Sequence, residues 1–209
     1  MDVTVITANF KTPELIEGCV LSFRSFYPHL RYIVIDNGGC AESLRVLRKI
    51  GDIELVENEE NVGHGPALHQ GVSMSTTRYI FTLDSDTTTR KGGFLERMVS
   101  MFEGDPRLFA LGWLRHVNDG GVAGGSHPYV HPCASLVDRE KYLTLPPYTH
   151  TGAPATQTMI EAVEAGYHLE DFPIFEYVDH KVAGTRGKFG GKWHVATDTE
   201  PGEYRWRPI

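Results

Sequence analysis

The sequence predicts one α/β domain built on a Rossmann-like, doubly wound mixed sheet, with an irregular C-terminal region. Over residues 1–110, short apolar runs alternate with segments of helical periodicity, as expected for parallel strands joined by helical crossovers. The 209-residue chain is 41% hydrophobic and 22% charged, values typical of globular proteins and not of disordered ones. Since neither a repeat nor a linker divides the chain, we expect a single domain over 1–209.

The predicted elements follow a strand–helix order. The strands are expected at 3–7, 32–35, 53–56 and 79–83, and the helices at 12–23, 41–49, 67–74, 94–102 and 156–166. Thr12 is expected to cap the first helix, with Pro13 in its first position and Glu14 in its first turn. In the last helix, Val163 is expected to point inward, together with Met159 and Ile160.

The second half is less regular in sequence. Glycines at 120, 121, 124 and 125 predict a loop, and prolines at 128, 132, 146 and 147 are expected to break any long element. We therefore expect this half to form a lid or a pocket over the first. His127 and His131 lie in this Gly/Pro-rich stretch without evident partners, so zinc is not expected there.

Charge and cysteine content limit the classes of function. The net charge of −7 argues against a protein that coats nucleic acid, although a local basic patch stays open. Cys19, Cys40 and Cys133 are an odd number without metal-type spacing, which predicts reduced thiols. The N-terminus lacks a signal-peptide pattern and no run of 18 apolar residues occurs, so we expect a cytoplasmic protein without a membrane span.

Polar residues follow three of the predicted strands. In open α/β sheets, ligands bind beyond the carboxyl ends of the strands. That rule selects residues 8–10, 36–38 and 84–86, which read Ala-Asn-Phe, Asp-Asn-Gly and Asp-Ser-Asp. Asp84 and Asp86, two apart on extended backbone, would point the same way and could hold Mg²⁺ or Mn²⁺. The alternative is that these two residues cap a turn or the next helix.

Four segments together resemble the family-2 glycosyltransferases of the GT-A fold, which use nucleotide-diphospho-sugars. They are residues 5–10, 32–38, 61–67 and 79–86. The resemblance extends well over 2–140 and loosely over 150–190. It implies a nucleotide-sugar-binding half at 1–110 and an acceptor-side half with a tail at 111–209.

The resemblance also implies roles for individual residues. The donor would be contacted by Ala8, Asn9, Phe10, Asp36, Asn61, Gly63, Asp84 and Ser85, with Arg186 and Lys188 near the phosphates. Asp36 would hydrogen-bond the base, usually uracil, because a carboxylate accepts from the imide N–H; otherwise Asp36 is a simple turn residue. Mn²⁺ or Mg²⁺ would be held by Asp86 and Asp84, and by His180 in a segment, 178–186, that resembles a late stretch of several relatives.

The sequence departs from the family at the catalytic base. Inverting members carry an Asp or Glu just before the last helix, but residues 148–157 contain no acid, and Gln157 occupies the aligned position. The candidate replacements are His150, Glu161 and Asp171, of which His150 has the most suitable ordinary pKa. The stereochemical outcome is therefore open, with inversion expected only by analogy.

We therefore expect a metal-dependent transferase that moves a sugar, from UDP by resemblance, to an unidentified hydroxyl acceptor. A nucleotidyltransferase is the first alternative, but residues 9–12 are not its Gly-rich basic loop. A sugar-nucleotide-binding module that lacks the base is the second, and it would bind the donor without turnover. Residues 132–135 are expected to form a pocket wall, and Trp113 and Trp193 either stack on a sugar or belong to the core.

Overall fold

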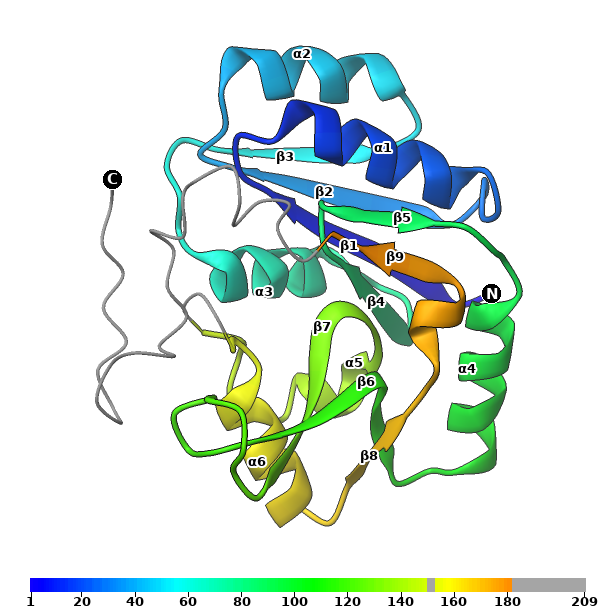
Figure 1. The fold of residues 1–209 in the computed structure, drawn as a ribbon, viewed down its shortest axis with the longest axis vertical. Coiled ribbons are helices and arrows are strands. Elements are labelled where there is room, and N and C mark those ends of the chain that lie inside the picture. Colours follow the sequence, from blue (N-terminus) through cyan, green and yellow to red (C-terminus); the bar gives the residue numbers. More distant parts are fainter. Residues whose placement is uncertain (150–152, 182–209) are drawn as a thin grey trace.

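The computed structural model describes residues 1–149 and 153–181, and its centre is a seven-stranded sheet (Figure 1). The strand order is β3-β2-β1-β4-β7-β6-β8. The strands are β1 (Val3–Asn9), β2 (Arg31–Asn37), β3 (Glu54–Asn58), β4 (Tyr79–Leu83), β6 (Leu108–Val117), β7 (His127–Asp138) and β8 (His168–Asp171). The first four are parallel to one another, and β7 runs antiparallel to both β4 and β6. The predicted mixed α/β sheet is confirmed.

Helices cover both faces of the sheet. One face carries α1 (Pro13–Arg24), α2 (Ala41–Ile50) and α4 (Phe94–Gly104), and the other carries α3 (His64–Met74), α5 (Arg139–Tyr142) and α6 (Thr156–Glu164). Strand β1 shows why two cores form. Val3 and Val5 face the first core, while Ile6 and Ala8 face the second, because successive side chains of a strand point to opposite faces.

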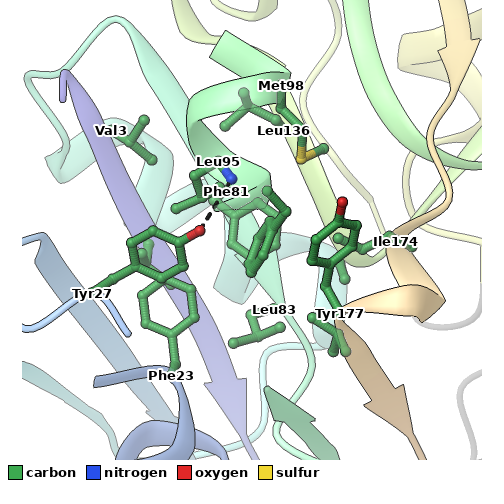
Figure 2. Packing of buried hydrophobic residues seen from close by; sticks show 14 of the residues in the cluster. Val3, Phe23, Tyr27, Phe81, Leu83, Leu95, Met98, Leu136, Ile174 and Tyr177 are labelled. Carbon is green, nitrogen blue, oxygen red and sulfur yellow. Dashed lines mark hydrogen bonds between the residues drawn. The ribbon is translucent and has the colours of Figure 1, made fainter. Parts of the chain in front are cut away.

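A second sheet of two antiparallel strands, β5 (Thr87–Thr89) and β9 (Val178–His180), lies against the first core (Figure 1). The short helix η1 (Ile174–Glu176) precedes β9. Figure 2 shows Tyr177 packed into the aromatic cluster that includes Phe23, Tyr27 and Phe81. The rings of Phe94 and Tyr177 lie 5.5 Å apart. This packing anchors the chain immediately before His180.

The start of the first helix differs from the prediction. Thr12 makes no side-chain capping bond to α1; its hydroxyl donates to Asn9 Oδ1 instead, at 2.7 Å. The buried face of α1 is confirmed, with Ile16, Cys19 and Phe23 all buried. The hydroxyl is used for a tertiary contact, which helix signals in the sequence do not reveal.

The second half is more regular than predicted. Strands β6 and β7 are the two longest, and Pro128 and Pro132 lie inside β7. Pro132 is tolerated because the β6–β7 pairing is interrupted between the Val130 and Ser135 pairs, so the ladder loses no hydrogen bond there. The prediction for Val163 was also wrong, since this side chain on α6 is 39% exposed.

No helix in residues 1–149 or 153–181 combines the length and the apolar character needed to cross a bilayer.

Candidate functional site

The candidate site lies where β1, β2 and β4 end. The strand order reverses between β1 and β4, and ligands of doubly wound sheets bind at such a switch point. The pairing register places Asn9 beside Asp36 and Asn37 beside Asn58. Asp84 follows β4 directly, and its N–H donates to Cys133 O of β7 at 2.8 Å. Polar groups that are distant in sequence therefore share one edge.

Asp36 belongs to a fixed network of hydrogen bonds. Asn9 Nδ2 donates to Asp36 Oδ1 at 2.7 Å, and Thr12 Oγ1 fixes the Asn9 amide by donating to its oxygen. The carboxyl group is buried, and this burial raises its pKa, opposed by the Asn9 hydrogen bond. A Cβ on Gly39 would lie 1.8 Å from Asp36 Oδ2. The network holds the carboxylate at the strand end, against the Gly39 backbone, where any side chain at residue 39 would collide with it.

Asn37 holds the glycine-containing loop against the strand ends. Its Nδ2 donates to Asn61 Oδ1 at 2.8 Å and to Gly63 O at 3.1 Å, and its Oδ1 accepts from Val62 N at 3.1 Å. Gly38 has a φ of +72°, and a Cβ there would lie 2.4 Å from Asn61 N. Only glycine fits this close approach. Asn37 lies in the segment 36–38 that the strand-end rule selected, but its role in holding the loop was not predicted.

Asp84, Asp86 and His180 form a cluster in which one ligand atom from each lies within 4.8 Å of the others. His180 Nε2 is 3.3 Å from Asp86 Oδ1 and 3.7 Å from Asp84 Oδ2. Strand β9 places the imidazole, because its pairing with β5 sets His180 opposite Thr87. These three residues, predicted from separate parts of the sequence, come together.

The prediction of extended backbone at Asp84 and Asp86 was wrong, because the chain makes a turn there. Thr87 N and Thr87 Oγ1 both donate to Asp84 O, at 3.1 and 2.7 Å, and so close a turn. The turn that was considered as an alternative does exist. It nevertheless brings both carboxylates to His180, with Ser85 buried between them.

Two histidines that were not predicted to belong to this site, His64 and His131, complete its surroundings. His64, the first residue of α3, places Nε2 3.4 Å from Asp84 Oδ1. The His131 ring lies 6.2 Å from that of His180, and it stands on β7, not in a loop without partners. His127 lies elsewhere, with Nε2 2.6 Å from Asp119. His64 lies within segment 61–67, one of the four that carry the family resemblance; His131 is brought to the site by the pairing of β7 with β4.

The local charges favour a cation. Burial would raise the pKa of Asp84, but the hydrogen bond from His64 and the charges of the neighbouring histidines lower it to about 2. The hydrogen bond to Asp86 raises the pKa of His180, whereas burial lowers that of His131 to about 4. Among the described residues, the polar contact of the buried Asp84 Oδ1 is the long one with His64 Nε2, at 3.4 Å. Hard carboxylate oxygens and an imidazole suit Mn²⁺ or Mg²⁺.

A model of glycosyl transferase family 2 matches residues 4–163. The chain belongs to this family. Among curated relatives, poly-beta-1,6-N-acetyl-D-glucosamine synthase of Staphylococcus aureus strain COL is 27% identical over 113 residues, which is 52% of this chain and 27% of that protein. The Staphylococcus epidermidis protein of the same name is 26% identical over 113 residues. The chain thus covers about a quarter, 27%, of the length of these relatives.

Solved structures share the fold of this chain. A mannosyltransferase from Pyrobaculum calidifontis, PcManGT, in complex with GDP-Man and Mn²⁺, superposes with a TM-score of 0.70 at 21% identity, over 82% of this chain and 55% of that chain. S. aureus TarS 1–349 in complex with UDP-GlcNAc gives 0.61 at 14% identity, over 85% and 58%. The GT-A-type fold implied by the sequence resemblance is confirmed.

The described residues at the start of α6 are 149 and 153–157. None of them is an Asp or Glu that could replace the family's acidic base. Glu161 accepts a hydrogen bond from Gln157 on α6 at 2.8 Å. Asp171 accepts from Leu114 N at 3.0 Å, at the exposed end of β8. Neither contributes to the cluster around Asp84.

Several predicted residues cannot be placed. His150, Arg186, Lys188 and Trp193 lie outside the described residues. Trp113 is partly buried and packs against His131, at a ring distance of 5.5 Å, and against Phe175, at 5.1 Å. It therefore belongs at least in part to the core.

Proposed function

We propose that this chain transfers a sugar from a nucleoside-diphosphate-sugar donor to an acceptor hydroxyl, with Mn²⁺ or Mg²⁺ held by Asp84, Asp86 and His180. The observation that carries the proposal is the convergence of three ligand atoms within 4.8 Å at the edge where Asp36 is also held. Family membership supports the type of reaction, and the complex of PcManGT with GDP-Man and Mn²⁺ supports the metal.

In this proposal, different parts of the donor would bind at the two ends of the sheet edge formed by the carboxyl ends of β1, β2 and β4. Asp36 would accept a hydrogen bond from a ring N–H of the base, which both uracil and guanine offer. The loop at Asn61 and Gly63, held by Asn37, would lie along the nucleotide. Asp86 and His180 would stand at the diphosphate. A bound divalent cation would supply charge neutralisation and Lewis acidity for the departing nucleoside diphosphate.

Thermal unfolding with nucleotides tests donor binding. The protein is heated with UDP, GDP, UDP-GlcNAc or GDP-Man, in Mn²⁺, in Mg²⁺ or in chelator. At about 100 times the dissociation constant, a ligand stabilises the fold by about 2.7 kcal/mol. We expect a stabilisation that needs the metal and favours one base. If none of the nucleotides raises the melting temperature in either metal, donor binding at this edge is wrong.

Turnover separates an enzyme from a binding module. With the donor that stabilises the protein, release of nucleoside diphosphate is measured with water alone and with a panel of methyl glycosides. We expect slow hydrolysis and faster transfer to at least one acceptor. Tight, metal-dependent donor binding with neither reaction would leave a sugar-nucleotide-binding module and would contradict the transferase proposal.

A further inference from the structure

A chain of aromatic rings leads from the metal cluster to the surface formed by β6 and η1. The ring centre of His131 lies 6.2 Å from that of His180 and 5.5 Å from that of Trp113. Trp113 in turn packs edge to face against Phe175, at 5.1 Å, and Phe175 is 40% exposed. Trp113 is itself partly exposed, so a ligand can reach it from solvent, and only the His131 ring stands between it and His180.

An interruption of the β6–β7 pairing places these rings. The regular pairing of the two strands breaks at Trp113, which lies across from the unpaired residues 131–134. His131 Nδ1 accepts from Cys133 N at 3.1 Å, which fixes the imidazole within this stretch. Irregularities of a ladder re-aim side chains and are frequent beside functional sites. The irregular stretch therefore turns Trp113 and His131 toward the same place.

Arg115 adds a positive charge beside Trp113. It stands two residues farther along β6, on the same side of the strand, and its guanidinium carbon lies 4.6 Å from the centre of the Trp113 ring. The residue is partly exposed, and within residues 1–149 and 153–181 its guanidinium makes neither a hydrogen bond nor an ion pair. Stacking on the ring leaves the N–H groups at the edge of the guanidinium plane free to donate.

The acidic residues next in sequence and on the neighbouring strand have other partners. Asp119, the first acidic residue after Arg115, lies 2.6 Å from His127 Nε2. Asp171, on the neighbouring strand β8, accepts from Leu114 N at 3.0 Å. The donors of the Arg115 guanidinium are therefore available to an anion that comes from outside the described chain.

We propose that Arg115 binds an anionic group of the acceptor, a phosphate or a carboxylate, beside the Trp113 ring. This inference rests on the proposed transferase function and names the class of its acceptor. We assign the anion to the acceptor because the contacts that lead from Arg115 to His180, where the donor diphosphate would stand, pass through both Trp113 and His131. A guanidinium recognises either anion through two parallel N–H bonds, and such charge-assisted bonds are stronger than neutral ones.

Acceptors that differ only in charge test the proposal. Each methyl glycoside of the transfer assay is offered in its neutral form, as its 6-phosphate and as its uronate, with UDP-GlcNAc or GDP-Man and Mn²⁺. We expect the wild type to use at least one charged form with a kcat/KM about 10- to 100-fold above that of the neutral form, because hydrogen bonds to a charged group are gained.

Variants of Arg115 then assign the preference to this side chain. Arg115→Gln should remove most of it, and Arg115→Lys, which keeps the charge but not the planar fork, should retain part of it. The loss in Arg115→Gln should be largest for the charged acceptors and much smaller for donor hydrolysis, which involves no acceptor anion. Arg78→Gln is the matched control and should keep the preference: the Arg78 guanidinium also stacks on a ring, 5.0 Å from the centre of Tyr79, but at the end of β4 opposite Asp84.

Several results would overturn the inference. Wild-type transfer that does not favour any charged form, with donor hydrolysis intact, would contradict it and leave the proposed transferase in place. Equal losses of hydrolysis and transfer in Arg115→Gln would assign the guanidinium to the donor. A lower melting temperature in Arg115→Gln than in Arg78→Gln, with the preference for charged acceptors unchanged, would show a partner within the chain. A wild-type protein without metal-dependent donor binding would remove the proposed function itself, and the inference with it.

Discussion

The two ends of the proposed donor-binding edge, a nucleoside end at Asp36 and a metal end at Asp84, hold their carboxylates in opposite ways. At the nucleoside end, Asp36 accepts from the neutral Asn9 amide, and burial raises its pKa. At the metal end, His64 and the neighbouring histidines lower the pKa of Asp84 to about 2. The first arrangement can stay unchanged when a base arrives. The second consists of carboxylate–imidazole pairs, which a cation would replace, so the metal end should respond far more strongly to its ligand.

The largest effect is expected at the metal end. Asp86→Asn should lower turnover in Mn²⁺ by about 10²- to 10³-fold, because a group that stabilises the leaving charge is lost. Steady-state release of nucleoside diphosphate measures it. Asp105→Asn is the control: it alters a similar pair, with Asp105 3.3 Å from His168 Nε2, outside the site. Equal losses in both variants would remove the metal role of Asp86.

The start of α3, which follows the loop held by Asn37, should be sensitive to added side-chain volume. Gly65 is the second residue of α3, and a Cβ there would lie 2.2 Å from Thr149 O. Gly65→Ala is therefore expected to lower the free energy of unfolding in urea by about 1–3 kcal/mol. Gly18→Ala on α1, where nothing lies within 4 Å of the added Cβ, should instead raise it by about 0.5–1 kcal/mol. Similar stabilities for the two variants would mean that the backbone at Thr149 can move away from residue 65.

At the nucleoside end, binding and stability should change in opposite directions. Asp36→Asn keeps an oxygen for the Asn9 amide but turns an N–H toward the base, so donor affinity should weaken by about 1–3 kcal/mol. Calorimetric titration with the preferred nucleotide measures this loss. An unchanged affinity for the nucleotide would show that Asp36 does not bind the base and is only a turn residue.

The stability change follows from the raised pKa of Asp36. Above that pKa the folded protein carries the full cost of a buried charge, and this cost disappears as the pH falls through it. Asp36→Asn should therefore be more stable than the wild type at pH 7, with the advantage shrinking toward pH 4. Asp36→Ala, which leaves the Asn9 amide without its acceptor, should be less stable at both. A pH-independent difference would contradict this reasoning.

The smallest effect concerns a thiol beside the nucleoside end. The Ser43 backbone N–H and then its hydroxyl lower the pKa of Cys40, whereas Cys19 is buried with a pKa of about 11 and the buried Cys133 is also raised. Iodoacetamide at pH 7 should therefore modify Cys40 first, and more slowly in Ser43→Ala. A bound nucleoside should slow the modification of Cys40 by itself, without the metal end, and should therefore do so in Asp86→Asn as well. If the nucleoside no longer protects Cys40 in Asp86→Asn, binding at the nucleoside end depends on the metal end.

Much of the fold followed from local patterns. Residues 79–83 form β4 with the predicted bounds, and the first helix buries the predicted face. The strand-end rule, which needs no knowledge of contacts, selects Asp36, Asp84 and Asp86. The errors lie where long-range contacts decide: Thr12 bonds Asn9 instead of its own helix, and Pro132 is accommodated by an interruption of the β6–β7 pairing.

The sequence by itself determined the order of strands and helices over residues 3–83 and the carboxylates at the strand ends, because apolar periodicity and turn residues act over a few neighbouring positions; the strands from β5 to β9 were not predicted. His180 was implied as a partner of those carboxylates by the family resemblance, but only the tertiary structure decided that His64 and His131 also lie beside them. His64, His131 and His180 reach Asp84 and Asp86 through a helix start, an antiparallel strand and a small second sheet. Such meetings depend on strand register and packing between distant segments, which no local pattern encodes.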